Sequence, residues 1–173
     1  MPQVIKPIST EVTGIKVNCY LVQTSTGFFL IDTGIAKKQA NLEKDLENAG
    51  CRPDNLKLIL LTHGDLDHSG NCAYLRKRYG AKIAMHRGDL ANVKSGDMFA
   101  NKNVNPVAKA IARFLFFVTG LGAFHPFTPD IFLEDGLDLS EFGWDATIIF
   151  LPGHSKGSIG ILTTDGDQIG RAH

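Results

Sequence analysis

Short apolar runs alternate with amphipathic segments along the first half of this chain. Four of these runs predict β-strands, at residues 15–23, 28–32, 56–61 and 81–85. The first two flank a Ser25-Thr26-Gly27 turn and so predict a hairpin. Helical spacing of apolar residues predicts helices over Lys37–Asn48 and Ser69–Tyr79, followed by Gly50 and Gly80. This alternation of strands and helices indicates an α/β fold.

The second half adds strands at Asp145–Phe150 and Ile159–Thr163. Between them and the first half the pattern changes, because residues 89–105 are polar and irregular while Val107–Val118 is an aromatic-rich helical run. We interpret this stretch as a helical insertion at about 87–129 within one domain spanning residues 1–173. The helix could fill the side of the core, act as a lid or dimer contact beside an apolar pocket, or lie on a membrane surface.

Composition narrows the class of protein and its partners. The 173 residues are 43% hydrophobic, enough for a core, and 18 basic side chains balance 18 acidic ones. No overall field therefore favours nucleic acid, and no run is long and apolar enough for an integral membrane segment. The three cysteines show no CxxC spacing and the first residues do not resemble a signal peptide, so we expect reduced thiols and a cytoplasmic location.

The densest chemical signal follows the third predicted strand. His63, Asp65, Asp67 and His68 place four potential metal ligands within six positions. Two imidazoles and two carboxylates so close together would repel one another or lose solvation unless a cation organised them. A solvated charged turn is the alternative interpretation, but His154, which follows a Pro-Gly turn after a later strand, makes a metal site the better one.

These motifs resemble those of the metallo-β-lactamase superfamily. His63-x-Asp65-x-Asp67-His68 is similar to its His-x-His-x-Asp-His loop, and residues 152–158 are similar to its later Pro-Gly-His motif. Residues 18–22 and the Asp32-Thr33-Gly34 turn resemble its opening strands. The resemblance implies a four-layer αβ/βα sandwich and a metal-dependent hydrolase.

The resemblance also assigns roles to the residues. His63, Asp65 and His154 would bind one metal, Asp67 and His68 would belong to a second site, and Asp67 would orient the attacking water or take its proton. Asp32 would accept hydrogen bonds from the loop and hold it in place. Zinc is the expected divalent transition metal, with iron or manganese as alternatives because Asp65 replaces a histidine with a harder ligand.

The chain also departs from the family pattern. The family's metal-bridging aspartate is expected where residues 168–173 stand, and neither it nor the last histidine is found. We therefore expect a truncated chain with an incomplete second half, weak hydrolysis, and exposed side chains at Ile159, Ile161 or their neighbours.

The substrate expected is a small molecule, an ester, thioester or lactone, because the insertion is apolar; a homodimer remains open. Two alternatives are an iron-binding redox protein, suggested by Asp65, and a non-catalytic metal-binding domain. Among the other histidines, His86 is a candidate for the pocket or for a role behind the ligands. His125 is a weaker candidate, and we assign no role to His173.

Overall fold

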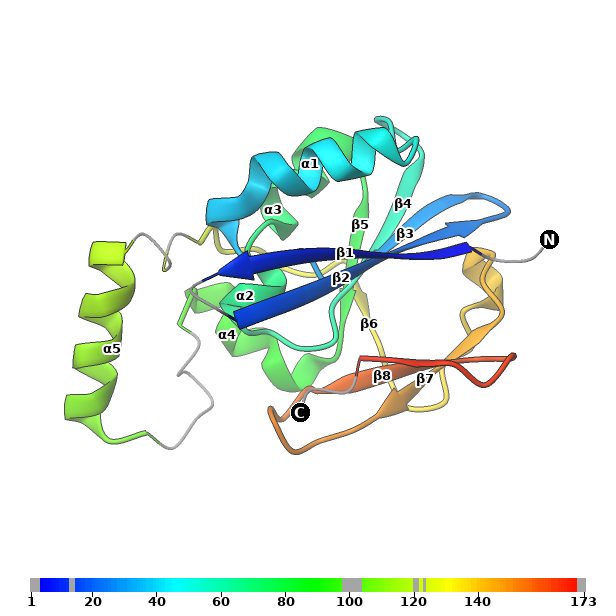
Figure 1. Cartoon of the computed structure of the whole chain (residues 1–173). Coiled ribbons are helices and arrows are strands. Elements are labelled where there is room, and N and C mark those ends of the chain that lie inside the picture. Colours follow the sequence, from blue (N-terminus) through cyan, green and yellow to red (C-terminus); the bar gives the residue numbers. More distant parts are fainter. Residues whose placement is uncertain (1–3, 13–14, 98–103, 120–121, 123, 171–173) are drawn as a thin grey trace.

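The computed structural model describes residues 4–12, 15–97, 104–119, 122 and 124–170. Two β-sheets lie face to face, and helices cover the outer side of the larger one (Figure 1). The larger sheet contains six strands in chain order, β1 (Val4–Val12), β2 (Ile15–Thr24), β3 (Gly27–Ile31), β4 (Leu56–Leu60), β5 (Lys82–Met85) and β6 (Ile131–Phe132). The smaller sheet contains three, β7 (Ala146–Phe150), β8 (Ile159–Thr163) and β9 (Gln168–Ile169).

The larger sheet changes direction at β3. Strands β1, β2 and β3 form an antiparallel meander, whereas β3, β4, β5 and β6 run parallel. Parallel neighbours need crossover connections. These are supplied by η1 (Ala36–Lys38) and α1 (Gln39–Asn48), then by α2 (Leu66–Ser69) and α3 (Cys72–Tyr79), and finally by η2 (Arg87–Asp89), α4 (Leu90–Ser95) and α5 (Pro106–Thr119).

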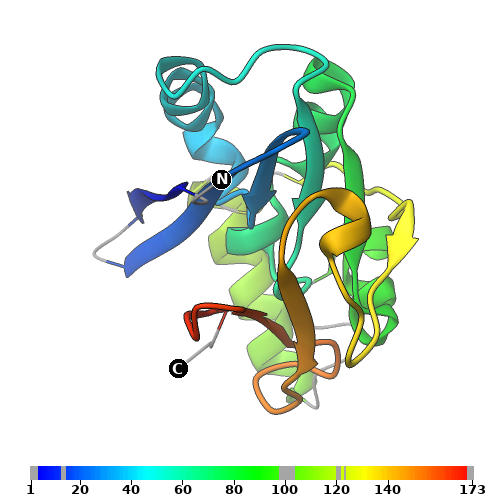
Figure 2. The ribbon, with the colours of Figure 1, turned by 90° about the vertical axis from the view of Figure 1, so that its right-hand side faces the viewer.

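Alternating side chains of the strands build two cores. Leu30 and Ile59 point toward the helices, where Leu42 and Leu46 of α1 pack with Leu75 of α3. Their neighbours along β3 and β4 point the other way and meet the smaller sheet, in a second core that consists of Phe29, Ile31, Leu58, Leu60, Trp144, Ile148, Ile159 and Ile161 with others. Strands β3 and β4 of the larger sheet thus bury side chains on both faces, as is usual for strands of a parallel sheet. Figure 2, turned by 90°, shows the two sheets as separate layers.

The expected sandwich is confirmed as an α/β fold with two sheets and helices on one outer side. Figure 1 draws no helix on the outer face of the smaller sheet in the described part of the chain. Exposed side chains were expected at Ile159, Ile161 or their neighbours; Ile159 and Ile161 themselves lie fully buried between the sheets, so the exposure falls on a neighbour. Their neighbour Leu162 points outward and is 40% exposed.

Several local predictions need correction. Residues 89–105 are not wholly irregular, because α4 occupies Leu90–Ser95, and β1 was not foreseen. The predicted helix at Ser69–Tyr79 is two helices, α2 and α3, and Gly80 ends the second with a φ of 74°. Helix α5 does not fill the side of the core, since the six large apolar side chains described on it are exposed. No helix among the described residues combines the length and apolarity needed to cross a membrane.

Candidate metal centre

Polar side chains gather where neighbouring parallel strands end. Asp32 follows β3, His63 and Asp65 follow β4, and Asp89 lies just beyond β5. The three strands are parallel, so their carboxyl ends meet at one edge of the sheet. In open α/β sheets this edge is where ligands bind.

Three of the side chains form a group that is suited to one metal ion. The ligand atoms of His63, Asp65 and His154 all lie within 4.8 Å of one another. Asp65 Oδ2 is 3.8 Å from His63 Nε2 and 3.0 Å from His154 Nε2. His63 and Asp65 are buried, whereas the His154 side chain is 39% exposed and comes from the loop between β7 and β8. The group would therefore offer three protein ligands and leave one side open, an arrangement typical of a catalytic metal site.

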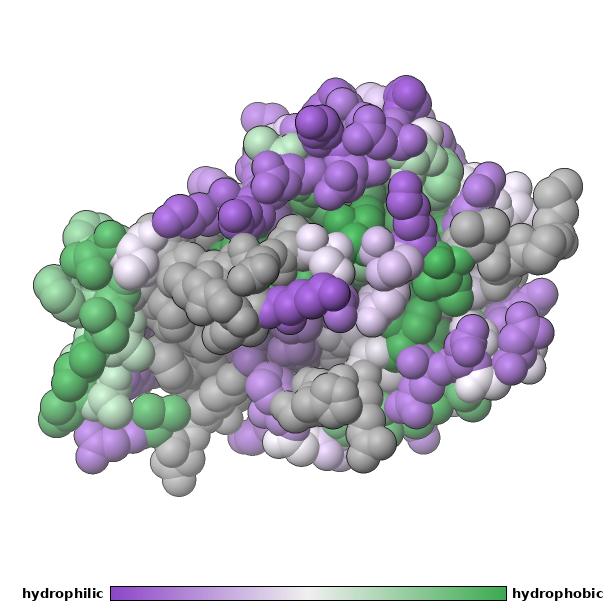
Figure 3. Space-filling model, in the orientation of Figure 1, coloured by the Kyte–Doolittle hydropathy of each residue, from purple (hydrophilic) through white to green (hydrophobic). Residues whose placement is uncertain are grey.

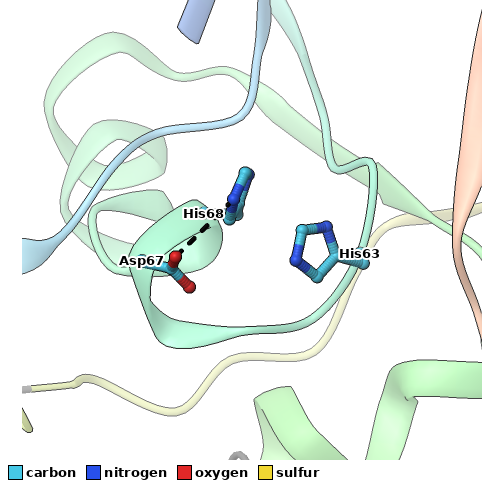
Figure 4. A group of neighbouring side chains, drawn as sticks. All are labelled: His63, Asp67 and His68. Carbon is cyan, nitrogen blue, oxygen red and sulfur yellow. Dashed lines mark ion pairs between the residues drawn. The ribbon is translucent and has the colours of Figure 1, made fainter. Parts of the chain in front are cut away.

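A second group shares His63 with the first. It consists of His63, Asp67 and His68, whose ligand atoms also lie within 4.8 Å of one another. Figure 4 shows Asp67 and His68 on α2, with His63 opposite them on the preceding loop. His68 Nε2 lies 3.7 Å from Asp67 Oδ2, and the rings of His63 and His68 are 4.1 Å apart. The backbone is extended at Asp65, which precedes α2, and Asp67 lies on the first turn of that helix.

Asp32 organises both histidines from behind. It accepts the Thr62 backbone N–H at 2.8 Å, the Thr62 hydroxyl at 2.7 Å and His68 Nδ1 at 2.8 Å. Since Thr62 gives its single hydroxyl proton to Asp32, its oxygen accepts from His63 Nδ1, 3.0 Å away. In their neutral forms, both rings are thereby held with Nε2 available as a ligand. The expectation that Asp32 holds the loop through hydrogen bonds is confirmed.

Electrostatics at the cluster favour a cation. Burial on its own would lower the pKa of His68, but the charge and hydrogen bond of Asp32, with Asp67 and Asp65, raise it to about 9. Burial, reinforced by the positive charge of His68, lowers the pKa of His63. Burial would raise the pKa of Asp32, yet His68 holds it below its ordinary value. The carboxylates thus draw a positive charge into the site, so the residues present fit a metal ion.

Asp89 joins the two loops that carry the ligands. Its side chain is fully buried, and Oδ2 accepts Gly64 N–H at 3.0 Å and the Ser155 hydroxyl at 2.6 Å. Oδ1 accepts Gly157 N–H at 3.0 Å. A Cβ atom at Gly64 would lie 2.9 Å from Asp89 Cβ, and one at Gly157 would lie 2.8 Å from Asp89 Cγ. The two glycines therefore let both loops close on one carboxylate.

The remaining sequence candidates lie outside the two groups. The His86 ring stacks on Phe150 with 4.5 Å between centroids, and its Nδ1 accepts Gly88 N–H. His125 is exposed, and His173 lies outside the described residues. Cys19, Cys51 and Cys72 are free and buried, and burial raises the pKa of Cys51 to about 12.

Sequence reasoning missed Asp89 and Thr62. A sequence signal for placing Asp89 near the site was present, because Asp89 comes shortly after a buried parallel strand, as Asp32 and His63 do. The five predicted ligands are brought together in the two groups, and metal binding by them remains a prediction.

Comparison with curated proteins finds relatives that are longer than this chain. It is 30% identical over 153 residues to the hydroxyacylglutathione hydrolase GloC of Haemophilus influenzae, covering 87% of this chain and 63% of that protein. It is 26% identical over 160 residues to the acyl-coenzyme A thioesterase MBLAC2 of Gallus gallus, and this match covers 85% of this chain and 53% of that protein. The chain thus spans between about half and two thirds of these relatives.

Solved structures and a family model agree on the fold. The metallo-beta-lactamase GOB-18 of Elizabethkingia meningoseptica superimposes with a TM-score of 0.67 at 23% identity, over 87% of this chain and 52% of that one. A mutant metallo-beta-lactamase of Cronobacter sakazakii superimposes with a TM-score of 0.69 at 23% identity, over 97% of this chain and 60% of that one. The family model of the metallo-beta-lactamase superfamily matches residues 12–167. With its ligand motifs, two sheets and this match, the chain belongs to the metallo-beta-lactamase superfamily.

Proposed function

We propose that this chain is the core of a metal-dependent hydrolase that acts on thioesters. The observation that carries the proposal is the group of His63, Asp65 and His154, which converges on one point and is open on one side. The names of the two relatives describe hydrolysis of acyl-glutathione and acyl-coenzyme A, and both are thioesters. They support a thioester over the ester and lactone alternatives.

The ligands favour one metal ion in the first group. His63 has only Nε2 available, because Nδ1 faces Thr62, so the two groups compete for the same nitrogen. Zinc suits two imidazoles and a carboxylate, and Asp65 makes iron or manganese acceptable. When bound, such an ion acts as a Lewis acid that polarises a carbonyl oxygen and makes water nucleophilic near neutral pH.

The surrounding side chains supply orientation and proton transfer. Asp67 is 44% exposed on the first turn of α2, so its carboxylate can accept a proton from water above the ligands. Asp32 fixes the ring of His68 and, through Thr62, that of His63. Asp89 keeps the His154 loop beside the His63 loop. Such positioning matters because a displacement of about 1 Å can cost on the order of a hundredfold in rate.

The test is hydrolysis of a defined substrate panel by the purified chain loaded with zinc, manganese or iron. An acyl-glutathione, an acyl-coenzyme A, a lactone, a β-lactam and a phosphodiester separate the substrate classes. We expect metal-dependent release of thiol from one or both thioesters. His63→Ala should abolish it because that ring belongs to both groups, whereas His125→Ala should not, because that ring is exposed and outside them.

Two outcomes would contradict the proposal. Equal activity of the His63→Ala and wild-type proteins would place the reaction elsewhere. Metal binding without turnover of any substrate would leave a metal-binding domain instead of an enzyme.

A redox function is the second candidate, and the observation that favours it is the carboxylate of Asp65 between two histidines. Two histidines and one carboxylate are also a ligand set of non-haem iron. Retention of iron over zinc after purification, with oxygen-dependent turnover, would support this function over hydrolysis.

A further inference from the structure

Exposed apolar side chains are concentrated on helix α5. Among the described residues, seven large apolar side chains are exposed, and six of them lie on this helix. They are between 53% and 82% exposed, whereas the seventh is Leu162 of the smaller sheet. Figure 3 shows the helix as a projecting apolar surface at the left of the molecule. A soluble monomer rarely leaves so many neighbouring apolar groups in water.

The apolar residues of α5 follow the spacing of a helix-pairing seam. Val107, Ile111, Phe114 and Val118 are four, three and four residues apart, the spacing of a and d positions in a heptad. Residues at this spacing share one face of a helix. Asn105 accepts the Val107 N–H at 2.8 Å and so caps the helix start. The face is thus regular over the length of the helix.

The basic side chains of α5 are directed away from this face. Lys109 Nζ lies 2.9 Å and Arg113 Nη2 2.6 Å from Asp97 Oδ2 on the body of the protein. A helix that binds a membrane surface normally uses its basic residues for the lipid headgroups. Here the only two basic residues of the helix are held by Asp97, so an apolar protein surface suits the seam better than a charged membrane.

We propose that α5 pairs with α5 of a second copy of this chain across a two-fold axis. The apolar face formed by Val107, Ile111, Phe114 and Val118 is complementary to itself, because a two-fold axis places the same uncharged face of each copy against the other. Side chains of this size, exposed by half or more, offer on the order of 100 Å² each. Two helices would then bury about 1,000–1,200 Å², near the lower limit for a specific interface. The pairing is therefore expected in the micromolar range.

Analytical ultracentrifugation of the full chain over roughly 1–100 µM tests the proposal. We expect the wild type to shift from monomer to twice that mass within this range. Phe114→Glu should remain monomeric throughout, with an unchanged melting temperature because Phe114 is exposed. Leu162→Glu is the matched control, since it also places a charge at an exposed apolar residue, and it should associate as the wild type does.

Three results would overturn the inference. The wild type could remain monomeric at all concentrations, or association could be lost in Leu162→Glu and kept in Phe114→Glu, which would place the interface on the smaller sheet. A monomer that co-sediments with vesicles of phosphatidylcholine and phosphatidylserine would instead assign the helix to a membrane.

Discussion

Asp89→Asn should weaken both the fold and the metal site, although the new side chain has nearly the same shape. The carboxylate accepts three hydrogen bonds, two on Oδ2 and one on Oδ1, from Gly64, Ser155 and Gly157. An amide that keeps the two bonds on its oxygen must turn its NH₂ toward the N–H of Gly157. The hydrogen bond from Gly157 is then lost, and two N–H donors, one from the amide and one from Gly157, face each other in a fully buried position.

The magnitude follows from these three bonds. A hydrogen bond to a charged group contributes about 1.5–3 kcal/mol, and a neutral one about 0.5–1.5 kcal/mol. Losing one bond and the charge on the other two therefore costs about 3–5 kcal/mol, a large part of a typical stability of about 5–15 kcal/mol. The loops carrying His63 and His154 would also separate, so metal affinity should fall roughly 10–100-fold.

Urea unfolding of the metal-free protein measures the first effect, and competition with a chromogenic chelator measures the second. Asp130→Asn is the matched control, because Asp130 Oδ2 also accepts a backbone N–H, that of Ile83 on β5 at 2.8 Å, away from the candidate ligands. It should cost about 1 kcal/mol or less and leave metal affinity unchanged, since its side chain is 38% exposed. An Asp89→Asn protein with stability and affinity close to those of the wild type would refute the reasoning.

Two further outcomes are expected. In the metal-free protein the pKa of His68 is raised to about 9 from about 6.5, so its stabilisation is complete below about pH 6.5 and is lost as the pH rises through 9. Urea midpoints at pH 6, 7.5 and 9 should therefore decline, and Asp32→Asn should abolish most of the decline; a flat profile would contradict the ion pair. Elemental analysis should find about one transition metal per chain, held by His63, Asp65 and His154, and two fully occupied sites would show that the competition for His63 Nε2 is not limiting.

Local patterns predicted those parts of the fold that depend on near neighbours in the chain. The strand Ile159–Thr163 was predicted with its observed bounds, and the loop of candidate ligands was recognised because its residues are adjacent in the chain. Strand β1 was missed because Pro7 argues against a strand, yet β1 is an edge of the sheet, where proline is tolerated. Helix α4 is short and buries Asn92, so its apolar pattern is weak.

The partners of Asp89 in distant segments could not be predicted from the sequence. Asp89 contacts residues 25, 66 and 68 positions away, and nothing in its neighbourhood announces such partners. The burial of Ile159 and Ile161 could not be predicted for a related reason. Alternation shows that a strand has two faces, but only the packing of the two sheets decides which face becomes the interior.

The candidate ligands of the first group lie on loops of different sheets. His63 and Asp65 follow β4 of the larger sheet, and His154 lies between β7 and β8 of the smaller one. An ion bound there would tie the two layers together, and at a concentration a thousand times its Kd it would add about 4 kcal/mol to stability. Metal supply and the lifetime of the protein are then coupled. Cells that run short of the metal would hold a chain whose smaller sheet opens more often, and faster amide exchange along β8 would record the shortage.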